Sequence, residues 1–251
     1  MADRGPRPGV TLHRFFLPPD AVQAESVTFP SEASRQIERV LRLKPGERVV
    51  VLDGSGMESV VVLETVGRTT TGSVEMTRRN EAEPATYLTL YQGLLKGAKM
   101  ELVLQKCTEV GVSRIVPVVT ARAVPAEPSS SRQGRFEIIA REAAEQSGRG
   151  QIPEISPPMR FSDAIVEACN SGPAVFFWEE ERSLRMKDLC VTHETPTVSL
   201  FIGPEGGFTE DEAEEARHAG CNIVTLGSRI LRAETAAIVG TTLLLAKYGD
   251  L

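Results

Sequence analysis

Apolar and polar positions follow their clearest pattern between residues 198 and 248. A run of apolar and β-branched residues over 198–202 predicts a buried strand, which the glycines and proline of 203–207 end sharply. Thr209 has Glu212 three positions later, the spacing of a capping box, so we expect a helix from there to Gly220. A second strand (222–226), a second loop (227–232) and an almost wholly apolar helix follow.

These residues form two strand–loop–helix units in tandem, and that arrangement predicts a parallel sheet. Ligands of open parallel sheets lie at the carboxyl ends of the strands. The loops 203–208 and 227–232 each follow a predicted strand. We therefore expect the chemistry of the protein at these two loops.

The rest of the chain divides near residue 82. Before it, short strands are expected, with one helix over 31–43 that places Ile37, Val40 and Leu41 on one face, and a small barrel or sandwich results. After it, strands and helices alternate, which predicts an α/β domain. Its expected strands are 86–92, 114–119 and 174–178, and its expected helices are 98–110, 131–146 and 163–169. The predicted domains are thus 1–82 and 83–251.

Composition adds few constraints on function. The chain has 251 residues and a net charge of −6, but residues 1–80 carry 11 basic and 10 acidic side chains, so a basic face on this part remains compatible with the acidic total. Four scattered cysteines favour a reduced, cytoplasmic protein, and three distant histidines argue against a metal site. Residues 1–9 lack the apolar core of a secretion signal and are expected to form a frayed tail, and no stretch is apolar enough to span a membrane.

The two loops differ from the common nucleotide-binding motifs. The sequence I-G-P-E-G-G-F (202–208) lacks G-x-G-x-x-G, and no Gly-Lys-Ser/Thr follows it. A glycine-rich loop lets backbone amides approach a ligand, although a tight structural turn is the alternative. In the second loop, Arg232 stands at a helix N-terminus against the helix dipole, which favours an anionic partner. The alternative is an ion pair with Glu234 or a surface contact.

Positive charge gathers near the helix predicted in the first domain, at Arg35, Arg39, Arg42, Lys44 and Arg48. Two interpretations stay open, a solvated helix face and a surface for RNA phosphates. In the second domain, spacing alone places Lys99, Lys106 and Arg149 toward solvent. Cys107 is expected in the core.

At the two loops the sequence resembles a known family. The motifs I-G-P-E-G-G-F-T-x-x-E and L-G-x-R-I-L-R-x-E-T-A are similar to those of the ribosomal RNA small subunit methyltransferase E family. The resemblance extends to K-G-x-K-M-E (96–101), E-x-x-E-Q-S-G-R (142–149) and V-L-R-L-K-x-G (40–46), and so covers nearly the whole chain. One departure is Gln36, where the family often has a histidine.

The resemblance implies a fold and a function. The fold would be a C-terminal domain of the SPOUT class, with a mostly parallel sheet and a deep trefoil knot, after a PUA-like barrel that binds RNA. The function would be methylation of N3 of a uridine in 16S rRNA of the small ribosomal subunit, with S-adenosylmethionine as cofactor. The resemblance further implies a homodimer whose active site lies near the subunit interface.

The resemblance, together with the chemistry of the reaction and the distribution of charge, suggests site residues. Arg232 and Glu234 are the expected catalytic pair, with Arg232 stabilising the uracil anion and Glu234 orienting it or accepting the proton through water. Glu205 is expected near the ribose or the sulfonium, or else caps a turn. The predicted RNA contacts are Arg14, Arg39, Arg42, Lys96, Lys99, Lys106 and Arg149. The predicted cofactor contacts are Phe201, Ile202, Gly203, Pro204, Glu205, Gly206, Gly207, Leu226, Gly227, Ser228, Ile230, Leu231, Arg232, Thr235 and Ala236.

Two other classes of protein are weighed against this prediction. A non-catalytic RNA-binding or assembly protein could keep the pocket as a relic, but the intact G-P-E-G-G and R-x-E-T-A motifs speak against it. A nicotinamide-dependent dehydrogenase is disfavoured because G-x-G-x-x-G and its acidic ribose partner are absent.

Overall fold

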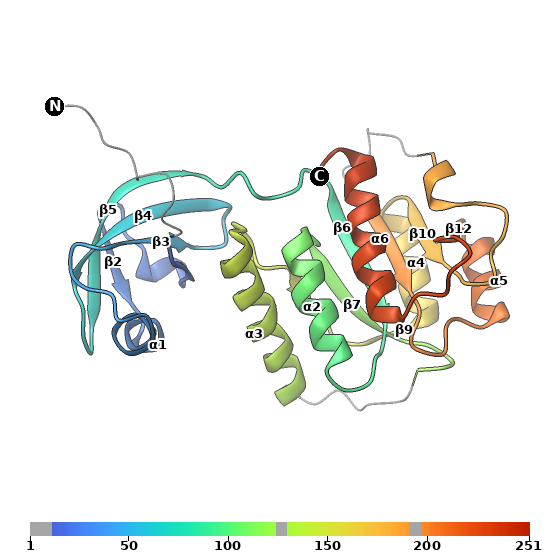
Figure 1. Cartoon of the computed structure of the whole chain (residues 1–251), viewed down its shortest axis with the longest axis horizontal. Helices are drawn as coiled ribbons and strands as arrows, with labels where there is room; N and C mark the ends of the chain where they lie inside the picture. Colours follow the sequence, from blue (N-terminus) through green and yellow to red (C-terminus); the bar gives the residue numbers. More distant parts are fainter. Residues whose placement is uncertain (1–11, 124–129, 191–196) are drawn as a thin grey trace. The chain divides into compact units, whose positions relative to one another are not determined.

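The computed structural model describes residues 12–123, 130–190 and 197–251, in two compact units (Figure 1). The predicted tail 1–9 lies outside the described residues. The first unit ends at Glu83 and also takes in residues 145–151, whereas the second comprises residues 84–144 and 152–251. From the sequence, residues 145–151 were assigned to the second domain.

The first unit is built on a five-stranded sheet in the order β1-β3-β4-β5-β2. Its central strands are antiparallel neighbours, and β1 pairs with β3 in parallel. Alternate apolar residues such as Val49, Val51, Val61 and Leu63 face a core that Phe15 and Phe29 complete. The elements are β1 (Arg14–Phe16), a 3₁₀ turn (Pro19–Ala21), β2 (Ser26–Phe29), α1 (Ser31–Arg35), a π-helix (Gln36–Leu41), β3 (Arg48–Leu52), β4 (Met57–Thr65) and β5 (Thr70–Arg79).

The helix predicted over 31–43 is one regular turn followed by a π-helical segment. Wider π turns change the angular spacing of side chains, so Ile37 is fully buried whereas Val40 is 71% exposed. The expectation that Val40 shares the buried face is therefore wrong. The segment ends at Arg42, whose backbone is left-handed with a φ of 55°.

Residues 145–151 are tied to the first unit by polar contacts. Glu145 Oε1 accepts a hydrogen bond from the amide of Phe16 at 3.0 Å. Arg149 is only 3% exposed, and its Nη2 lies 2.8 Å from Glu83 Oε2. The expectation that Arg149 faces solvent is therefore wrong, because an unpaired guanidinium could not be buried at acceptable cost and Glu83 supplies the partner.

The second unit is organised around a sheet in the order β12-β10-β11-β6-β7-β8, with β9 also pairing with β7. Every described pair in it is parallel. This confirms the predicted α/β class. Its strands are β6 (Tyr87–Gly93), β7 (Arg114–Val119), β8 (Glu154–Ile155), β9 (Met159–Arg160), β10 (Ala174–Phe177), β11 (Thr197–Ile202) and β12 (Asn222–Val224). Its helices are α2 (Lys99–Val110), α3 (Ser130–Ser147), α4 (Phe161–Ser171), a 3₁₀ turn (Met186–Asp188), α5 (Glu210–His218) and α6 (Ala233–Tyr248).

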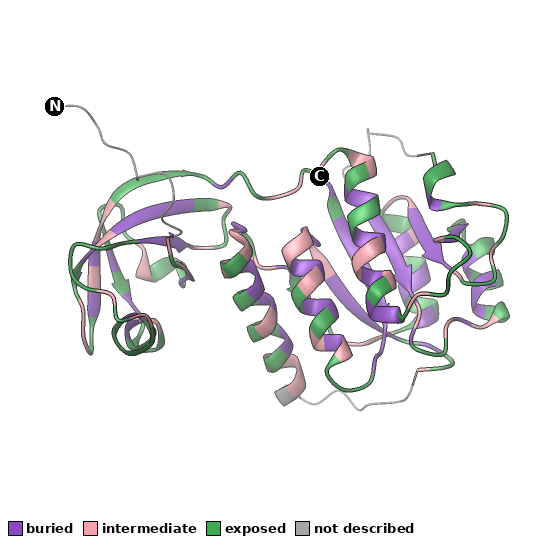
Figure 2. Cartoon of the chain, in the orientation of Figure 1, coloured by how far each residue is buried: buried purple, intermediate pink, exposed green. Residues whose placement is uncertain are grey.

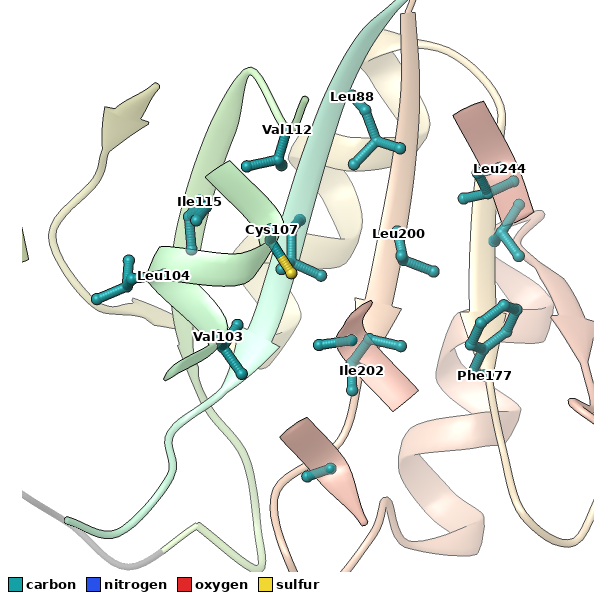
Figure 3. Close-up of a cluster of buried hydrophobic side chains, with 14 of the residues drawn as sticks. Leu88, Val103, Leu104, Cys107, Val112, Ile115, Phe177, Leu200, Ile202 and Leu244 are labelled. Carbon is teal, nitrogen blue, oxygen red and sulfur yellow. The ribbon is translucent and has the colours of Figure 1, made fainter. Parts of the chain in front are cut away.

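Helices cover both faces of this sheet, and its strands are buried between them (Figures 1 and 2). On one face, Leu200 and Ile202 of β11 pack with Leu104 and Cys107 of α2 and Leu244 of α6 (Figure 3). On the other face lies an aromatic cluster formed by Tyr91, Phe161, Phe176, Phe201 and Phe208. The alternation of β11 between the two cores fixes its register, because a shift by one residue would exchange the faces.

Among the described residues, no helix has the length and apolar character needed to cross a membrane. In the same part of the chain, no group of three or more His, Cys, Asp or Glu side chains is arranged to hold a metal ion.

Candidate functional site

The three neighbouring strands β10, β11 and β12 end at one edge of the parallel sheet, and a cavity of about 580 Å³ opens there. The loops that follow β11 and β12 both line it, as the sequence pattern predicted. Volumes of several hundred cubic ångströms are typical of small-molecule sites. The edge of the sheet therefore carries a candidate small-molecule site.

Most of the predicted cofactor contacts line this cavity, and three do not. Phe201 points to the opposite face of the sheet, where its ring stacks on Tyr91 with centroids 4.5 Å apart. Gly206 and Thr235 are also absent from the described lining. The predicted residues that do line the cavity are Ile202, Gly203, Pro204, Glu205, Gly207, Leu226, Gly227, Ser228, Ile230, Leu231, Arg232 and Ala236.

The segment that follows β10 lines the cavity but was not singled out from the sequence. It contributes Trp178, Glu179, Glu181, Arg182 and Arg185, and Phe177 at the end of β10 lines the cavity as well. Its backbone joins the second loop, because the amide of Thr225 donates to the Leu184 carbonyl at 2.9 Å and the amide of Met186 donates to the Thr225 carbonyl at 3.1 Å. The missing signal was topological: β10 lies between β11 and β12, so its carboxyl end had to reach the same edge.

The first loop turns tightly beside the end of β6. The amide of Gly207 donates to the Pro204 carbonyl at 2.9 Å, and Gly207 has a φ of 68° that favours glycine. Gly93 allows the loop to approach, since a Cβ at that position would lie 2.5 Å from the backbone nitrogen of Pro204. The buried ring of Phe208 then anchors the loop in the aromatic cluster, 4.2 Å from that of Phe176.

Glu205 binds groups of the protein itself. Its Oε1 accepts from the Lys96 amide at 3.2 Å and pairs with Lys99 Nζ at 3.0 Å. Partial burial acts to raise the pKa of Glu205, but the hydrogen bonds from Lys99 and Lys96 outweigh it and leave the pKa below its ordinary value. The carboxylate is therefore ionised at neutral pH and holds the loop to the start of α2.

The second loop leads into α6 and presents the predicted catalytic pair. Thr225 Oγ1 accepts from the amide of Gly227 at 3.2 Å, and the loop then exposes Ile230, which is 86% accessible. Arg232 is the exposed N-cap residue of α6. Glu234 is only 9% exposed, and its Oε2 has no hydrogen-bond partner.

The sequence left open an ion pair between Arg232 and Glu234. Within the described part of the chain, neither side chain has an ion-pair partner within 4.0 Å. A buried polar atom without a hydrogen-bond partner is costly, so the unpartnered Oε2 of Glu234 is a candidate for contact with a ligand. Among the described residues that line the cavity, Arg232 is thus exposed without an ion pair, and the nearly buried Glu234 keeps one carboxyl oxygen without a hydrogen-bond partner.

The predicted RNA contacts have different surroundings. On the first unit, Arg39 is 74% exposed with only a 3.9 Å contact to Glu38, and Arg42 is exposed. Arg14 is half-buried, and its Nε has no partner. On the second unit, Lys96 is exposed, whereas Lys106 pairs with Glu109 at 2.8 Å.

Comparison with known proteins places these features in a family. The model of an RNA methyltransferase domain matches residues 82–245. Ribosomal RNA small subunit methyltransferase E from Synechocystis sp. is 31% identical over 244 residues, which cover 92% of this chain and 76% of that protein. The protein of that name from Bacillus subtilis is 29% identical over 90% of this chain and 93% of its own length.

A solved structure agrees with these matches. The Neisseria gonorrhoeae ribosomal RNA small subunit methyltransferase E, crystallised with S-adenosylmethionine, superposes with a TM-score of 0.87 at 29% identity. The superposition covers 94% of this chain and 98% of that one. This chain belongs to the ribosomal RNA small subunit methyltransferase E family.

Proposed function

We propose that the protein uses S-adenosylmethionine to methylate N3 of a uridine in 16S rRNA of the small ribosomal subunit. The observation that carries the proposal is the cavity at the ends of β10, β11 and β12, where the family motifs meet and where Glu234 keeps an unpaired oxygen. Family membership supports methyl transfer to rRNA, and the choice of N3 follows from the resemblance described above.

The residues around the cavity fit the proposed cofactor. Backbone groups of 203–207 and 226–231 can approach it closely at Gly203, Gly207 and Gly227, which line the cavity and carry no side chain. Trp178 Nε1 is a buried donor without a partner in the described structure. An unsatisfied buried donor is costly in an empty pocket and is available for an acceptor group of a ligand. When bound, S-adenosylmethionine supplies an activated methyl group on a sulfonium.

The chain's own task is then to prepare the acceptor nitrogen. N3 of uracil carries a proton, and its loss spreads negative charge over the two flanking carbonyl oxygens. We place the guanidinium of Arg232 against that charge, since five fixed donors suit a delocalised anion. Glu234 accepts the N3 proton directly or through water. The products are N3-methyluridine, S-adenosylhomocysteine and the released proton, so atoms and charge balance.

Two variants test these roles. In Arg232→Ala, methyl transfer should fall by roughly 10²- to 10³-fold, the cost of removing one oxyanion donor, while S-adenosylmethionine binding persists. Glu234→Gln should also lose methyl transfer, with the fold intact because the amide is nearly isosteric. Transfer of labelled methyl groups measures the rate and calorimetry measures cofactor affinity. Unimpaired transfer in both variants would refute the assignment.

The position of the methyl group has its own test. N3 lies on the pairing edge of uracil, so a methyl group there stops reverse transcriptase during primer extension. We expect a stop on 16S rRNA from wild-type cells that disappears in a deletion strain. A methylated base that reverse transcriptase reads through would exclude N3 and leave methylation of rRNA at another atom.

Further parts of the proposal concern partners and fold. Arg39 and Arg42 would contact rRNA phosphates, so neutralising both should weaken binding and flatten its salt dependence, and an unchanged salt slope would exclude this surface. We also propose the deep trefoil knot in the SPOUT domain, a PUA-like character for the first unit, a homodimer and a cytoplasmic location. Sedimentation in solution tests the dimer.

A further inference from the structure

Arg122 lies outside the described lining of the cavity and binds the backbone of loop 203–208. Its Nη1 donates to the carbonyl of Gly206 at 2.9 Å and to the carbonyl of Phe208 at 3.1 Å. Arg122 follows β7, the strand beyond β6 as counted from β11, so the contact joins two segments about 85 residues apart in the chain. Hydrogen bonds from a charged donor are about twice as strong as neutral ones. The two bonds therefore restrain the backbone of the loop.

The position of Arg122 is itself fixed by its neighbours. The amide of Ala121, the preceding residue, donates to Glu212 Oε1 at 2.8 Å. Glu212 is buried, and its other oxygen accepts from the amide of Thr209 at 2.9 Å in the capping box of α5. The segment that carries Arg122 is thus attached to the helix that begins just after the loop.

Gln92 holds the start of the same loop from beneath. Its fully buried Nε2 donates to the carbonyls of Gly93 at 3.0 Å and Gly203 at 3.2 Å, with a longer contact to Ile202 at 3.5 Å. Three carbonyl oxygens surrounding one amide nitrogen also fix which atom of the amide is nitrogen. Gln92 therefore orients the peptides through which β11 enters the loop.

From these contacts we propose that Gln92 and Arg122 are positioning residues, which hold loop 203–208 in the shape that receives the cofactor before the cofactor arrives. The inference rests on the proposed function of the cavity. Neither residue is part of the described lining of the cavity, so each acts through the loop and not by touching the ligand.

The fraction of molecules whose loop 203–208 can bind the cofactor determines the apparent affinity. A loop released from Arg122 samples conformations that cannot bind, and the apparent dissociation constant rises as the competent fraction falls. Loss of hydrogen bonds worth about 1.4 kcal/mol corresponds to a tenfold change. Once the cofactor is bound, it holds the loop in place itself. The KM for S-adenosylmethionine should therefore rise while kcat at saturating cofactor stays near wild type.

The experiment compares the full-length variants Arg122→Ala and Gln92→Met with wild type. Arg122 is exposed, so its replacement leaves the fold intact, and methionine matches the length of Gln92 without its donor. The control is Arg160→Ala, which removes an exposed arginine of the same unit that lies outside the described lining of the cavity. Calorimetry gives the dissociation constant of S-adenosylmethionine, steady-state methyl transfer gives KM and kcat, and circular dichroism gives the thermal midpoint.

We expect about a tenfold weaker cofactor affinity in Arg122→Ala and in Gln92→Met, and no change in Arg160→Ala. Arg122→Lys, which keeps a donor but not the planar fork, should recover part of the loss. Unchanged cofactor affinity in Arg122→Ala would overturn the inference, and so would a rise only in the KM for rRNA, which would make Arg122 an RNA contact. Failure of wild type to bind S-adenosylmethionine would instead overturn the proposed function.

Discussion

The replacement of Gly93 by alanine tests how closely the first loop must approach the sheet. A Cβ at residue 93 would lie 2.5 Å from the nitrogen of Pro204, 2.7 Å from its Cδ and 2.9 Å from the carbonyl carbon of Gly203. Two of these three atoms are backbone atoms, so rotation of a side chain cannot remove the clash. Strand β6 pairs on both sides, with β11 and β7, and we therefore expect the loop to move and the strand to stay.

The size of the movement sets the size of the effect. To reach the 3.4 Å at which ordinary contact begins, the loop must retreat by about 0.9 Å. Misplacement of about 1 Å in a binding element can cost on the order of 10²-fold in rate. Overpacking should also lower the free energy of unfolding by about 1–3 kcal/mol. We expect Gly93→Ala to fold and to lose about 10²-fold in kcat/KM for S-adenosylmethionine.

The assay pairs methyl-transfer kinetics with urea unfolding, and Gly134→Ala is the matched control. Gly134 lies within α3, and a Cβ there would have no atom within 4 Å. Alanine at residue 134 should raise stability by up to about 1 kcal/mol, through helix propensity, and leave activity unchanged. Wild-type kcat/KM in Gly93→Ala would refute the reasoning, because it would show that the loop tolerates displacement.

Three further predictions concern single contacts. Thr209→Ala removes the capping box of α5 and should lower the free energy of unfolding by about 1 kcal/mol in urea titrations. The pKa of Glu205 is lower in the folded protein than its ordinary value of 4.5. Its contribution to stability is therefore present above that value and is lost as pH falls through the folded pKa. Urea titrations at successive acidic pH values should show that the free energy of unfolding of Glu205→Gln falls less with decreasing pH than that of wild type. Trp178→Phe keeps an aromatic ring but removes the unpaired donor, and calorimetry should show weaker S-adenosylmethionine binding at an unchanged thermal midpoint.

The region from 197 to 218 could be predicted closely because its signals are local. The apolar run gave β11, and Thr209 with Glu212 gave the start of α5, whose capping box is present in the structure. The second strand was predicted to reach residue 226 but ends at Val224. Thr225 still makes an isolated parallel bridge with Arg185, but its Oγ1 bonds with the backbone of Gly227, and the chain turns there.

Other structural features could not be predicted, because local sequence patterns do not show contacts with residues far away in the chain. Arg149 was predicted to face solvent from spacing alone, but Glu83, 66 residues earlier, makes its burial possible. The π-helical segment after Arg35 departs from the period of 3.6 residues on which the helix prediction depended. Prediction of Trp178 as a cavity residue would have required the order of the strands, which sequence periodicity does not show.

The sequence identified charged residues of the site, but it did not identify which of them pair with each other. Glu205 and Lys99 were assigned to cofactor and RNA separately, whereas the structure joins them at 3.0 Å. Arg232 and Glu234 were considered as an ion pair, and the structure leaves each without such a partner in the described residues. Spacing along a helix or loop identifies candidate groups, but the choice among their partners is made by tertiary packing.

The cavity between 203–207 and 225–232 is the proposed binding site of the methyl donor. A crystal structure of the protein with S-adenosylmethionine tests this most directly. We expect the donor within that cavity, hydrogen-bonded to backbone groups of both loops, with its methyl group toward Arg232 and Glu234. Donor bound at any other place, with these loops unoccupied, would contradict the account.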